Sequence, residues 1–306
     1  MKTVFFGTPN IAIPFLEVLH KNSDIQLVIT QPDKPRGRGM QISPCETKVK
    51  AQELGLEVAH KIPAQINAEL GGAVAYGRLI KKETISQFKH GIINIHFSML
   101  PKYRGASPVQ YALLNGDTKT GVTAFFIDEG MDTGDIFLQK EIDISPEDTA
   151  LTLFPKLIEA GTSILKECLA KIEQKNITRT KQTGESSNAP LINKEDYKLN
   201  FEQESAEKIH NKIRALGFGK AVADINDKPL NLKILKTSIA EDKIFQVSST
   251  QKPSTIIFIE RGLGFFVKCN SGVLLIEKLL PAGKKEISAY DFITGNQKKV
   301  GDTLFI

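Results

Sequence analysis

Apolar and polar positions in the first part of the chain predict a strand, a helix and a second strand. Lys2–Phe6 is a largely apolar run that ends at Gly7, and Ile11–Leu19 repeats its apolar residues at helical spacing. Ile25–Ile29 is a second apolar run. This order is typical of a parallel α/β unit. Because the first turn lacks the G-x-G-x-x-G pattern, the sequence predicts a Rossmann-like topology without a dinucleotide-binding fingerprint.

A polar segment separates this α/β pattern from a region of a different kind. Pro146–Ile172 has a long amphipathic pattern, which predicts a helix packed on the sheet. Glu173–Lys194 is mostly polar and contains T-G-E-S-S-N-A-P, which is typical of a linker. Glu202–Leu216 is again helical in pattern. Short runs with strand character follow, at Ala221–Ile225, Leu230–Leu235, Thr255–Phe258, Gly264–Val267 and Val273–Leu279. Strands of this length and spacing predict a small β-barrel.

The size and composition of the chain narrow the class of protein. A chain of 306 residues with 41% hydrophobic content can bury a sizeable core and divide into two domains. No window approaches twenty apolar residues, and the N-terminus begins with a predicted strand rather than a targeting segment. We therefore expect no membrane span and a cytoplasmic location. Cys45, Cys168 and Cys269 are scattered and odd in number, so we expect reduced thiols and no metal site.

The net charge of +5 is concentrated in the last third of the chain. From Phe201 onward there are 16 Lys and Arg against 12 Asp and Glu, so this part holds +4 of the total. A basic accessory domain suits a polyanionic partner such as RNA. Charge that only keeps the protein in solution explains the same numbers equally well.

Three polar side chains near the middle of the chain carry candidate chemistry. Asn94 and His96 end an apolar run, and two residues that are two apart in a strand point to the same face. Ligands of open α/β sheets bind beyond the carboxyl ends of the strands, where this pair would lie. Asp132 follows in a Gly-rich segment. An amide, an imidazole and a carboxylate suit a reaction that stabilises an oxyanion and moves a proton.

No obvious nucleophile accompanies these residues. Ser98 is close in sequence but lacks the G-x-S-x-G elbow, and no cysteine lies near. This favours direct transfer between two bound substrates over a covalent intermediate. Taken by the pattern alone, Asn94 and His96 are more often a structural polar pair than a catalytic one.

Thr30–Pro44 is rich in Pro, Gly and cations, with Lys34, Arg36 and Arg38 inside it. Guanidinium groups match phosphate geometry, and glycines give such a loop reach. By composition alone, a solvated surface loop is the more frequent explanation.

The motifs together resemble one known family. The central ones are I-N-I-H-F-S-M-L-P-K-Y-R-G at Ile93–Gly105 and D-E-G-M-D-T-G-D at Asp128–Asp135. Others are F-F-G-T-P at 5–9, T-Q-P-D-K-P-R-G-R-G at 30–39, A-Y-G at 75–77 and L-P-A-G-K-K-E-I-S-A-Y-D-F at 280–292. The chain resembles the 10-formyltetrahydrofolate-dependent formyltransferases over nearly its whole length. Within them it is most similar to the family of methionyl-tRNA formyltransferases.

The resemblance implies an α/β fold in two domains. We expect a Rossmann-like, parallel-sheet catalytic domain at residues 1–180, a linker at 181–203, and an OB-like β-barrel that binds tRNA at 204–306. It also implies 10-formyltetrahydrofolate as formyl donor without a metal, methionyl initiator tRNA as acceptor, and N-formylmethionyl-tRNA as product for translation initiation. We expect a monomer.

The resemblance also assigns roles to individual residues. Asn94 and a protonated His96 would stabilise the oxygen of a tetrahedral intermediate, with Asp132 orienting His96. Asp135 is a rival carboxylate, but the M-D-T-G motif places Asp132 in the catalytic position. The residues expected to contact the folate are Tyr76, Gly77, Arg78, Leu79, Ser98, Met99, Leu100 and Pro101. Leu100–Pro101 is a candidate cis peptide, a feature mostly confined to proline. Arg38, and with it Arg36 and Lys34, would contact the tRNA.

Some features depart from the family pattern and leave alternatives open. Residues 59–74 form a shorter segment than usual, with a strand expected after Gly71 and Gly72, and Phe97 replaces a small residue or Pro. Ala215–Lys220 also differs from the usual pattern, which affects tRNA contacts more than the chemistry. One alternative is a formyltransferase for a small amine such as a nucleotide-linked amino sugar. Another is an RNA-binding protein without activity, although intact Asn94, His96 and Asp132 argue against it.

Overall fold

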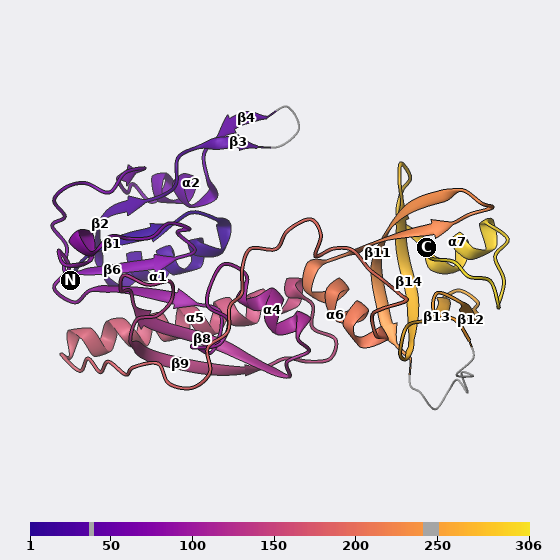
Figure 1. Cartoon of the computed structure of the whole chain (residues 1–306). Coiled ribbons are helices and arrows are strands. Elements are labelled where there is room, and N and C mark those ends of the chain that lie inside the picture. The colour runs from indigo at the N-terminus through magenta and orange to yellow at the C-terminus, as the bar shows by residue number, and fades with distance from the viewer. Residues whose placement is uncertain (37–39, 241–250) are drawn as a thin grey trace. The chain divides into compact units, whose positions relative to one another are not determined.

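The computed structural model describes residues 1–36, 40–240 and 251–306 (Figure 1). Its contacts divide the chain into two compact units. The N-terminal unit comprises Met1–Pro108, Lys119–Ile144 and Leu153–Leu191. The C-terminal unit comprises Val109–Thr118, Ser145–Thr152 and Ile192–Ile306. Residues 181–191, which have the composition of a linker, therefore belong to the N-terminal unit by their contacts.

A seven-stranded sheet forms the centre of the N-terminal unit, with the strand order β5-β2-β1-β6-β7-β8-β9. The strands are β1 (Lys2–Gly7), β2 (Asp24–Ile29), β5 (Val58–Ala59), β6 (Leu70–Val74), β7 (Ile92–His96), β8 (Lys119–Phe126) and β9 (Ile136–Asp143). The first five in spatial order pair in parallel, while β8 and β9 join antiparallel. The predicted Rossmann-like parallel sheet is thus present, with an antiparallel extension on one edge.

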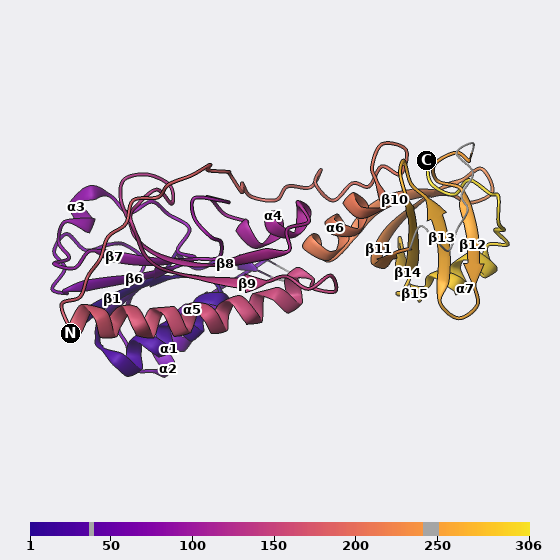
Figure 2. The same cartoon turned by 90° about the horizontal axis from the view of Figure 1, so that it is seen from below.

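Helices cover both faces of this sheet. Those in the N-terminal unit are η1 (Asn10–Ala12), α1 (Ile13–Asn22), α2 (Glu46–Glu53), α3 (Lys82–Ile85) and most of α5 (Ala150–Glu173), while α4 (Pro108–Leu114) belongs to the C-terminal unit apart from its first residue. Figure 2 shows α1 and α5 on the same face. Gly161 of α5 allows this packing, because a Cβ there would come within 2.9 Å of Phe15 in α1 and 3.2 Å of Ile95 in β7.

Strand β6 begins earlier than the sequence indicates, because both of its glycines lie within it. Gly71 and Gly72 pair with β1 and β7, so the strand keeps its backbone hydrogen bonds despite its short length. A Cβ on Gly71 would lie 2.8 Å from Cγ1 of Ile92. The glycine therefore leaves room for an apolar side chain of β7, which is fully buried.

The basic segment predicted as a loop contains a two-stranded hairpin, β3 (Lys34–Arg36) and β4 (Gln41–Ser43). At its base the Lys48 ammonium lies 2.7 Å from Oδ2 of Asp33. Lys34 is exposed, and its Nζ donates to Oε1 of Gln31. Arg38 lies outside the described residues.

The C-terminal unit is built on a six-stranded antiparallel sheet. Its strands are β10 (Gly219–Asp224), β11 (Pro229–Ile239), β12 (Ile256–Glu260), β13 (Gly264–Lys268), β14 (Val273–Pro281) and β15 (Ile287–Ser288). Two helices accompany them, α6 (Ala206–Leu216) and α7 (Ala289–Gly295). Ser205 caps the start of α6, and Gly217 ends it in the left-handed conformation.

The last residues of the chain join the two edges of this sheet. Phe305 bridges to Ala223 beside β10, and Thr303 bridges to Thr255 beside β12. Between these bridges, the N–H of Leu304 donates to Ser254 and its carbonyl accepts from Asp224. The sheet therefore closes into the small barrel that the short strands predict.

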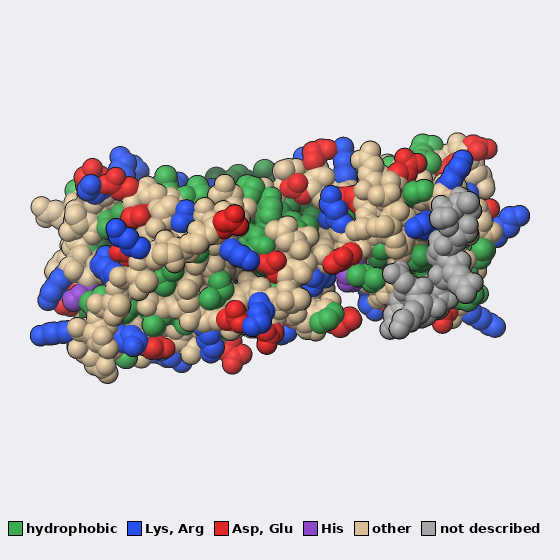
Figure 3. Space-filling view, turned by 60° about the horizontal axis from the view of Figure 1, so that its bottom comes forward, with side chains coloured by type: hydrophobic (Ala, Val, Ile, Leu, Met, Phe, Trp, Pro, Cys, Tyr) green, Lys and Arg blue, Asp and Glu red, His purple; other side chains and the backbone are tan. Residues whose placement is uncertain are grey.

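Further observations concern membrane-spanning helices, metal ligands, cysteines and surface charge. In the parts of the chain that the structure describes, no helix is long and apolar enough to span a membrane, and no group of three or more acidic, His or Cys residues is placed to hold a metal. The three cysteines are free and buried. On the face drawn in Figure 3, basic and acidic side chains lie interspersed rather than in single-sign patches.

Candidate active site

Strand β7 places Asn94 and His96 on the face of the sheet opposite α1 and α5. The alternation of a strand sends Ile95 and Phe97 toward those helices instead. The Phe97 ring packs edge-on against Phe15, with centroids 6.0 Å apart. Phe97 contributes to the wall of the cavity described next, but its ring is anchored among the helices.

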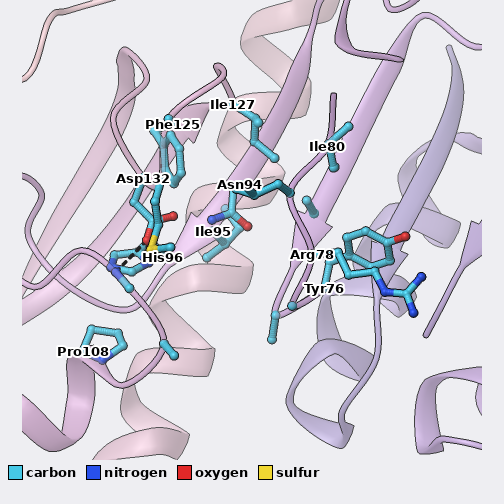
Figure 4. Close-up of a pocket in the computed structure, with 18 of the residues that line it drawn as sticks. Tyr76, Arg78, Ile80, Asn94, Ile95, His96, Pro108, Phe125, Ile127 and Asp132 are labelled. Carbon is cyan, nitrogen blue, oxygen red and sulfur yellow. Dashed lines mark hydrogen bonds and ion pairs between the residues drawn. The ribbon is translucent and has the colours of Figure 1, made fainter. Parts of the chain in front are cut away.

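A cavity of about 510 Å³ lies beside these two residues, wholly within the N-terminal unit. Its walls come from the end of β7, the turn after β6, the segment after Gly105 and the loop after β8. In Figure 4, Asn94, His96 and Asp132 gather at one end, and Tyr76 and Arg78 lie at the other. The size is within the range of small-molecule sites, so one organic substrate fits.

The turn after β6 supplies the predicted residues Tyr76, Gly77, Arg78 and Leu79, and all four line this cavity. The turn is held from outside, because Nε2 of Gln31 donates to the carbonyls of Tyr76 and Gly77, at 3.0 and 3.3 Å. Burial raises the pKa of Tyr76, so its phenol is neutral and presents an O–H. The turn can therefore offer both backbone and side-chain groups to a ligand.

The structure does not bring Ser98, Met99, Leu100 and Pro101 to the cavity wall. Their polar atoms are used within the turn that they form. Ser98 Oγ donates to the carbonyl of Lys102 at 2.6 Å, and the N–H of Leu100 donates to Thr123 Oγ1 at 3.1 Å. The Leu100–Pro101 peptide is cis, as predicted. This segment shapes the chain that follows His96, and its four residues are not among those that line this cavity.

His96 is buried, and its tautomer is fixed by its surroundings. Its Nε2 lies 2.8 Å from the carbonyl oxygen of Tyr103, which can only accept, so Nε2 carries a hydrogen. Its Nδ1 faces Oδ2 of Asp132 at 3.7 Å. Burial lowers the pKa of His96 below its ordinary value near 6.5, outweighing the opposing effects of Asp132 and Tyr103. At neutral pH the ring is therefore uncharged, not protonated as the family resemblance implied, and Nδ1 is available as a proton acceptor.

Asp132 occupies a strained position in the loop after β8. Its φ of 55° lies in the left-handed region, which non-glycine residues seldom adopt. Its Oδ2 accepts the N–H of Gly105 at 2.8 Å, and its carbonyl accepts from Gln182 Nε2 at 2.8 Å. Asp135, the rival carboxylate, does not line the cavity. The geometry therefore favours Asp132 as the partner of His96.

Asn94 completes the group. Its side chain is half-buried and lines the cavity, and its amide makes no hydrogen bond to any residue in the described ranges. A half-buried side-chain amide without a hydrogen-bond partner is available to donate to a ligand oxygen. In Figure 4 this amide lies beside His96 and points into the cavity.

Comparison with known proteins identifies the family. The model of the formyl transferase domain matches residues 1–169, and that of the formyl transferase C-terminal domain matches residues 191–297. The chain belongs to the formyl transferase family. The second match covers most of the C-terminal barrel, so both units have counterparts in this family.

Curated members of the formyl transferase family match the chain along its whole length. The methionyl-tRNA formyltransferase of Elusimicrobium minutum is 43% identical over 333 aligned positions, which cover 100% of both chains. Enzymes of the same name from Thermodesulfovibrio yellowstonii and Clostridioides difficile are 40% and 37% identical. Those alignments cover 97% and 98% of this chain, and 97% and 99% of the relatives.

Solved structures of formyl transferases share the fold. The N-formyltransferase of Helicobacter canadensis, solved with folinic acid and dTDP-3-aminofucose, has a TM-score of 0.67 and 25% identity, covering 90% of this chain and 98% of its own. The sugar 3N-formyl transferase WlaRD, solved with dTDP and 5-N-formyl-THF, has a TM-score of 0.67 and 27% identity, covering 93% and 99%.

Sequence reasoning missed the groups that hold His96 and Asp132, the candidate catalytic side chains. These are the carbonyl of Tyr103, the N–H of Gly105 and the side chain of Gln182. The first two lie inside the K-Y-R-G motif but act through the backbone, which residue identity does not disclose. Gln182 lies in a polar segment whose composition is typical of a linker, and no local signal distinguishes it there.

Proposed function

We propose that the protein transfers the formyl group of 10-formyltetrahydrofolate to the α-amine of methionyl initiator tRNA. The observation that carries this proposal is the trio of Asn94, His96 and Asp132 in one cavity. It combines a free amide donor, a neutral imidazole with a fixed tautomer, and a carboxylate. The full-length similarity to enzymes named methionyl-tRNA formyltransferase supports the same reaction.

The cavity provides for the formyl donor. Its volume of about 510 Å³ suits a ring system the size of a pterin, and its turn from Tyr76 to Leu79 exposes backbone groups for the hydrogen-bonding edge of such a ring. We assign folate contacts to Tyr76, Gly77, Arg78 and Leu79. Ser98–Pro101 act indirectly, by shaping the turn that leads to Tyr103. The formyl carbon would then lie at the end of the cavity where Asn94 and His96 meet.

The three residues divide the chemistry among them. The neutral α-amine, whose ordinary pKa is about 8, attacks the formyl carbon and forms the new C–N bond. The formyl oxygen becomes an oxyanion, and the amide N–H of Asn94 stabilises it. His96 Nδ1 accepts the proton that the attacking nitrogen must lose. The resulting imidazolium is stabilised by Asp132 and returns the proton to the departing nitrogen of the donor as its C–N bond breaks.

The acceptor would be held partly by the basic hairpin. Lys34 is exposed at its base, and Arg36 is on β3. Lysine and arginine at such a position bind nucleic acid through the phosphate backbone, which fixes register without reading bases. We include Arg38, between the two strands, in the same contact. The part of the chain from Phe201 onward carries a net charge of +4, which adds a sequence-independent attraction for tRNA.

A transfer assay with three acceptors tests this function. Formyl transfer from 10-formyltetrahydrofolate would be measured to methionyl initiator tRNA, to methionyl elongator tRNA and to a nucleotide-linked amino sugar. The sugar is included because the two solved neighbours are sugar N-formyltransferases. We expect strong preference for the initiator tRNA. Transfer to the sugar alone would replace the proposal by a sugar formyltransferase, and folate binding with no transfer to any acceptor would refute it.

A further inference from the structure

We propose that Gln182, in the segment leaving the N-terminal unit, is a positioning residue that holds His96 and Asp132 in register for formyl transfer. The proposal rests on the function given above. In Figure 2 the chain after α5 returns on the side of the sheet opposite that helix. There, residues 182–189, here called the return segment, lie against the loops that follow β7 and β8.

Gln182 uses its whole side-chain amide to join these two loops. Oε1 accepts from Arg104 Nη2 at 2.7 Å and from Arg104 Nε at 3.2 Å. Nε2 donates to the carbonyl oxygens of Asp132 and Gly134, at 2.8 and 2.9 Å. A primary amide has two acceptor sites and two donor hydrogens, so all four are satisfied. Among the ordinary side chains, only Asn shares this set, and it is shorter by one methylene.

The backbone of the return segment extends the same contact along the loop after β7. The N–H of Arg104 donates to the carbonyl of Ser187 at 2.8 Å, and the N–H of Ala189 donates to the carbonyl of Arg104 at 2.7 Å. Ser187 Oγ accepts the N–H of Tyr103 at 2.9 Å. Gly105 permits this close approach, because a Cβ there would lie 2.7 Å from the carbonyl oxygen of Ala189. The loop is therefore fixed on both sides of Arg104.

The groups fixed in this way are those that contact the catalytic side chains. The carbonyl of Tyr103 sets the tautomer of His96, and the N–H of Gly105 binds the Asp132 carboxylate. The carbonyl of Asp132 itself is bound by Gln182. Both loops thus meet at one side chain, and Asp132 is held by hydrogen bonds to its backbone carbonyl and to its carboxylate. Without Gln182, Asp132 has no bond to its carbonyl from the return segment and can relax away from His96.

Replacement of Gln182 by Met tests the proposal, because Met keeps the length and removes all four hydrogen bonds. We expect kcat for formyl transfer to fall roughly 10- to 100-fold, the size of effect expected when a reacting group is displaced by about 1 Å. The KM values for folate and for tRNA should not change, because Gln182 lines neither the cavity nor the basic hairpin. The rate is normalised to active protein by folate titration. Thr183→Ala, an exposed change in the next residue, is the matched control.

Two further measurements separate positioning from general stability. Gln182 and Arg104 share one contact, which either single substitution removes. The loss of kcat in the double variant Gln182→Met/Arg104→Met should therefore be smaller than the product of the losses in the two single variants. Hydrogen exchange should quicken in peptides covering residues 103–107 and 128–134 in Gln182→Met but not in Thr183→Ala. Wild-type kcat with unchanged exchange in Gln182→Met would overturn the proposal. If wild-type protein formylates no acceptor, the proposed function fails, while the exchange experiment still decides whether Gln182 holds both loops.

Discussion

His96 and Asp132 face each other across 3.7 Å, from Nδ1 to Oδ2, which is too long for a direct hydrogen bond. Because Nε2 carries the ring hydrogen, both facing atoms are acceptors. The close approach of two acceptor atoms is favourable only when a hydrogen-bond donor lies between or beside them. Oδ2 already accepts the N–H of Gly105, whereas Nδ1 has no donor among the described residues, so we expect an incoming amine to donate to Nδ1.

Replacement of His96 by Ala should lower kcat by about 10²- to 10⁴-fold, because a positioned general base contributes roughly that factor. Folate affinity should be retained, since His96 acts on the transferred proton rather than on the pterin. Stopped-flow or filter-based formyl transfer measures the rate, and ligand fluorescence measures folate binding. His20→Ala, at the exposed end of α1, serves as the control. A kcat equal to that of the control would remove His96 from the chemistry.

The pH dependence of kcat should follow His96. Burial places its pKa below about 6.5, so the base is neutral and active at pH 7, and kcat should fall as pH drops through that lowered pKa. Asp132 raises the pKa of His96, although burial outweighs it. In Asp132→Asn this negative charge is lost, so the imidazolium form of His96 is less favoured. The acid limb of the kcat profile should therefore move to lower pH, and the plateau value of kcat should fall. A limb that stays in place, or moves to higher pH, would show that Asp132 does not act on the titrating group.

The basic hairpin predicts a selective effect on tRNA. Arg38→Gln should raise the KM for tRNA and leave folate affinity unchanged, with a smaller effect for Arg36→Gln or Lys34→Gln. Each lost phosphate contact should reduce the slope of log affinity against log salt by about one. Titrations at several salt concentrations measure this slope. Lys166→Gln, an exposed charge on α5, is the control. Equal slopes for Arg38→Gln and this control would exclude Arg38 as a phosphate contact.

Two adjacent glycines of β6 offer a matched test of packing. Gly71→Ala should destabilise the N-terminal unit by about 1–3 kcal/mol, because its Cβ would overlap Ile92 in a filled core. At Gly72 the nearest atom is Cδ2 of Leu19 at 3.3 Å, and the change should alter stability by less than about 1 kcal/mol. Urea unfolding monitored by loss of folate binding reports on this unit. Equal midpoints for the two variants would contradict the packing argument.

The sequence predicts most elements of this fold because their signals are local. The first strands, the long helix and the short strands of the barrel each have an apolar period that a window of the chain contains. The pairing of Asn94 with His96 follows from the same alternation. The hairpin between Lys34 and Ser43 escapes this reasoning, because it has no apolar face and its strands are three residues each.

The start of β6 and the support of the site are not local properties. Gly71 and Gly72 have weak strand propensity, and their place in the sheet is set by the neighbours β1 and β7. Arg104 and Gln182 are 78 positions apart, and no local pattern in either segment predicts their contact. The sequence therefore indicates the candidate catalytic side chains by type, while the groups that orient them become visible only in the folded chain.

The return segment also limits where the chain can be divided into separate domains. Composition suggests a division near residue 180, yet Gln182, Ser187 and Ala189 all lie beyond that point and complete the loops around the catalytic residues. A catalytic module that is transplanted to another accessory domain must therefore carry its tail through residue 191. The segment that has the composition of a linker is therefore part of the support of the candidate site.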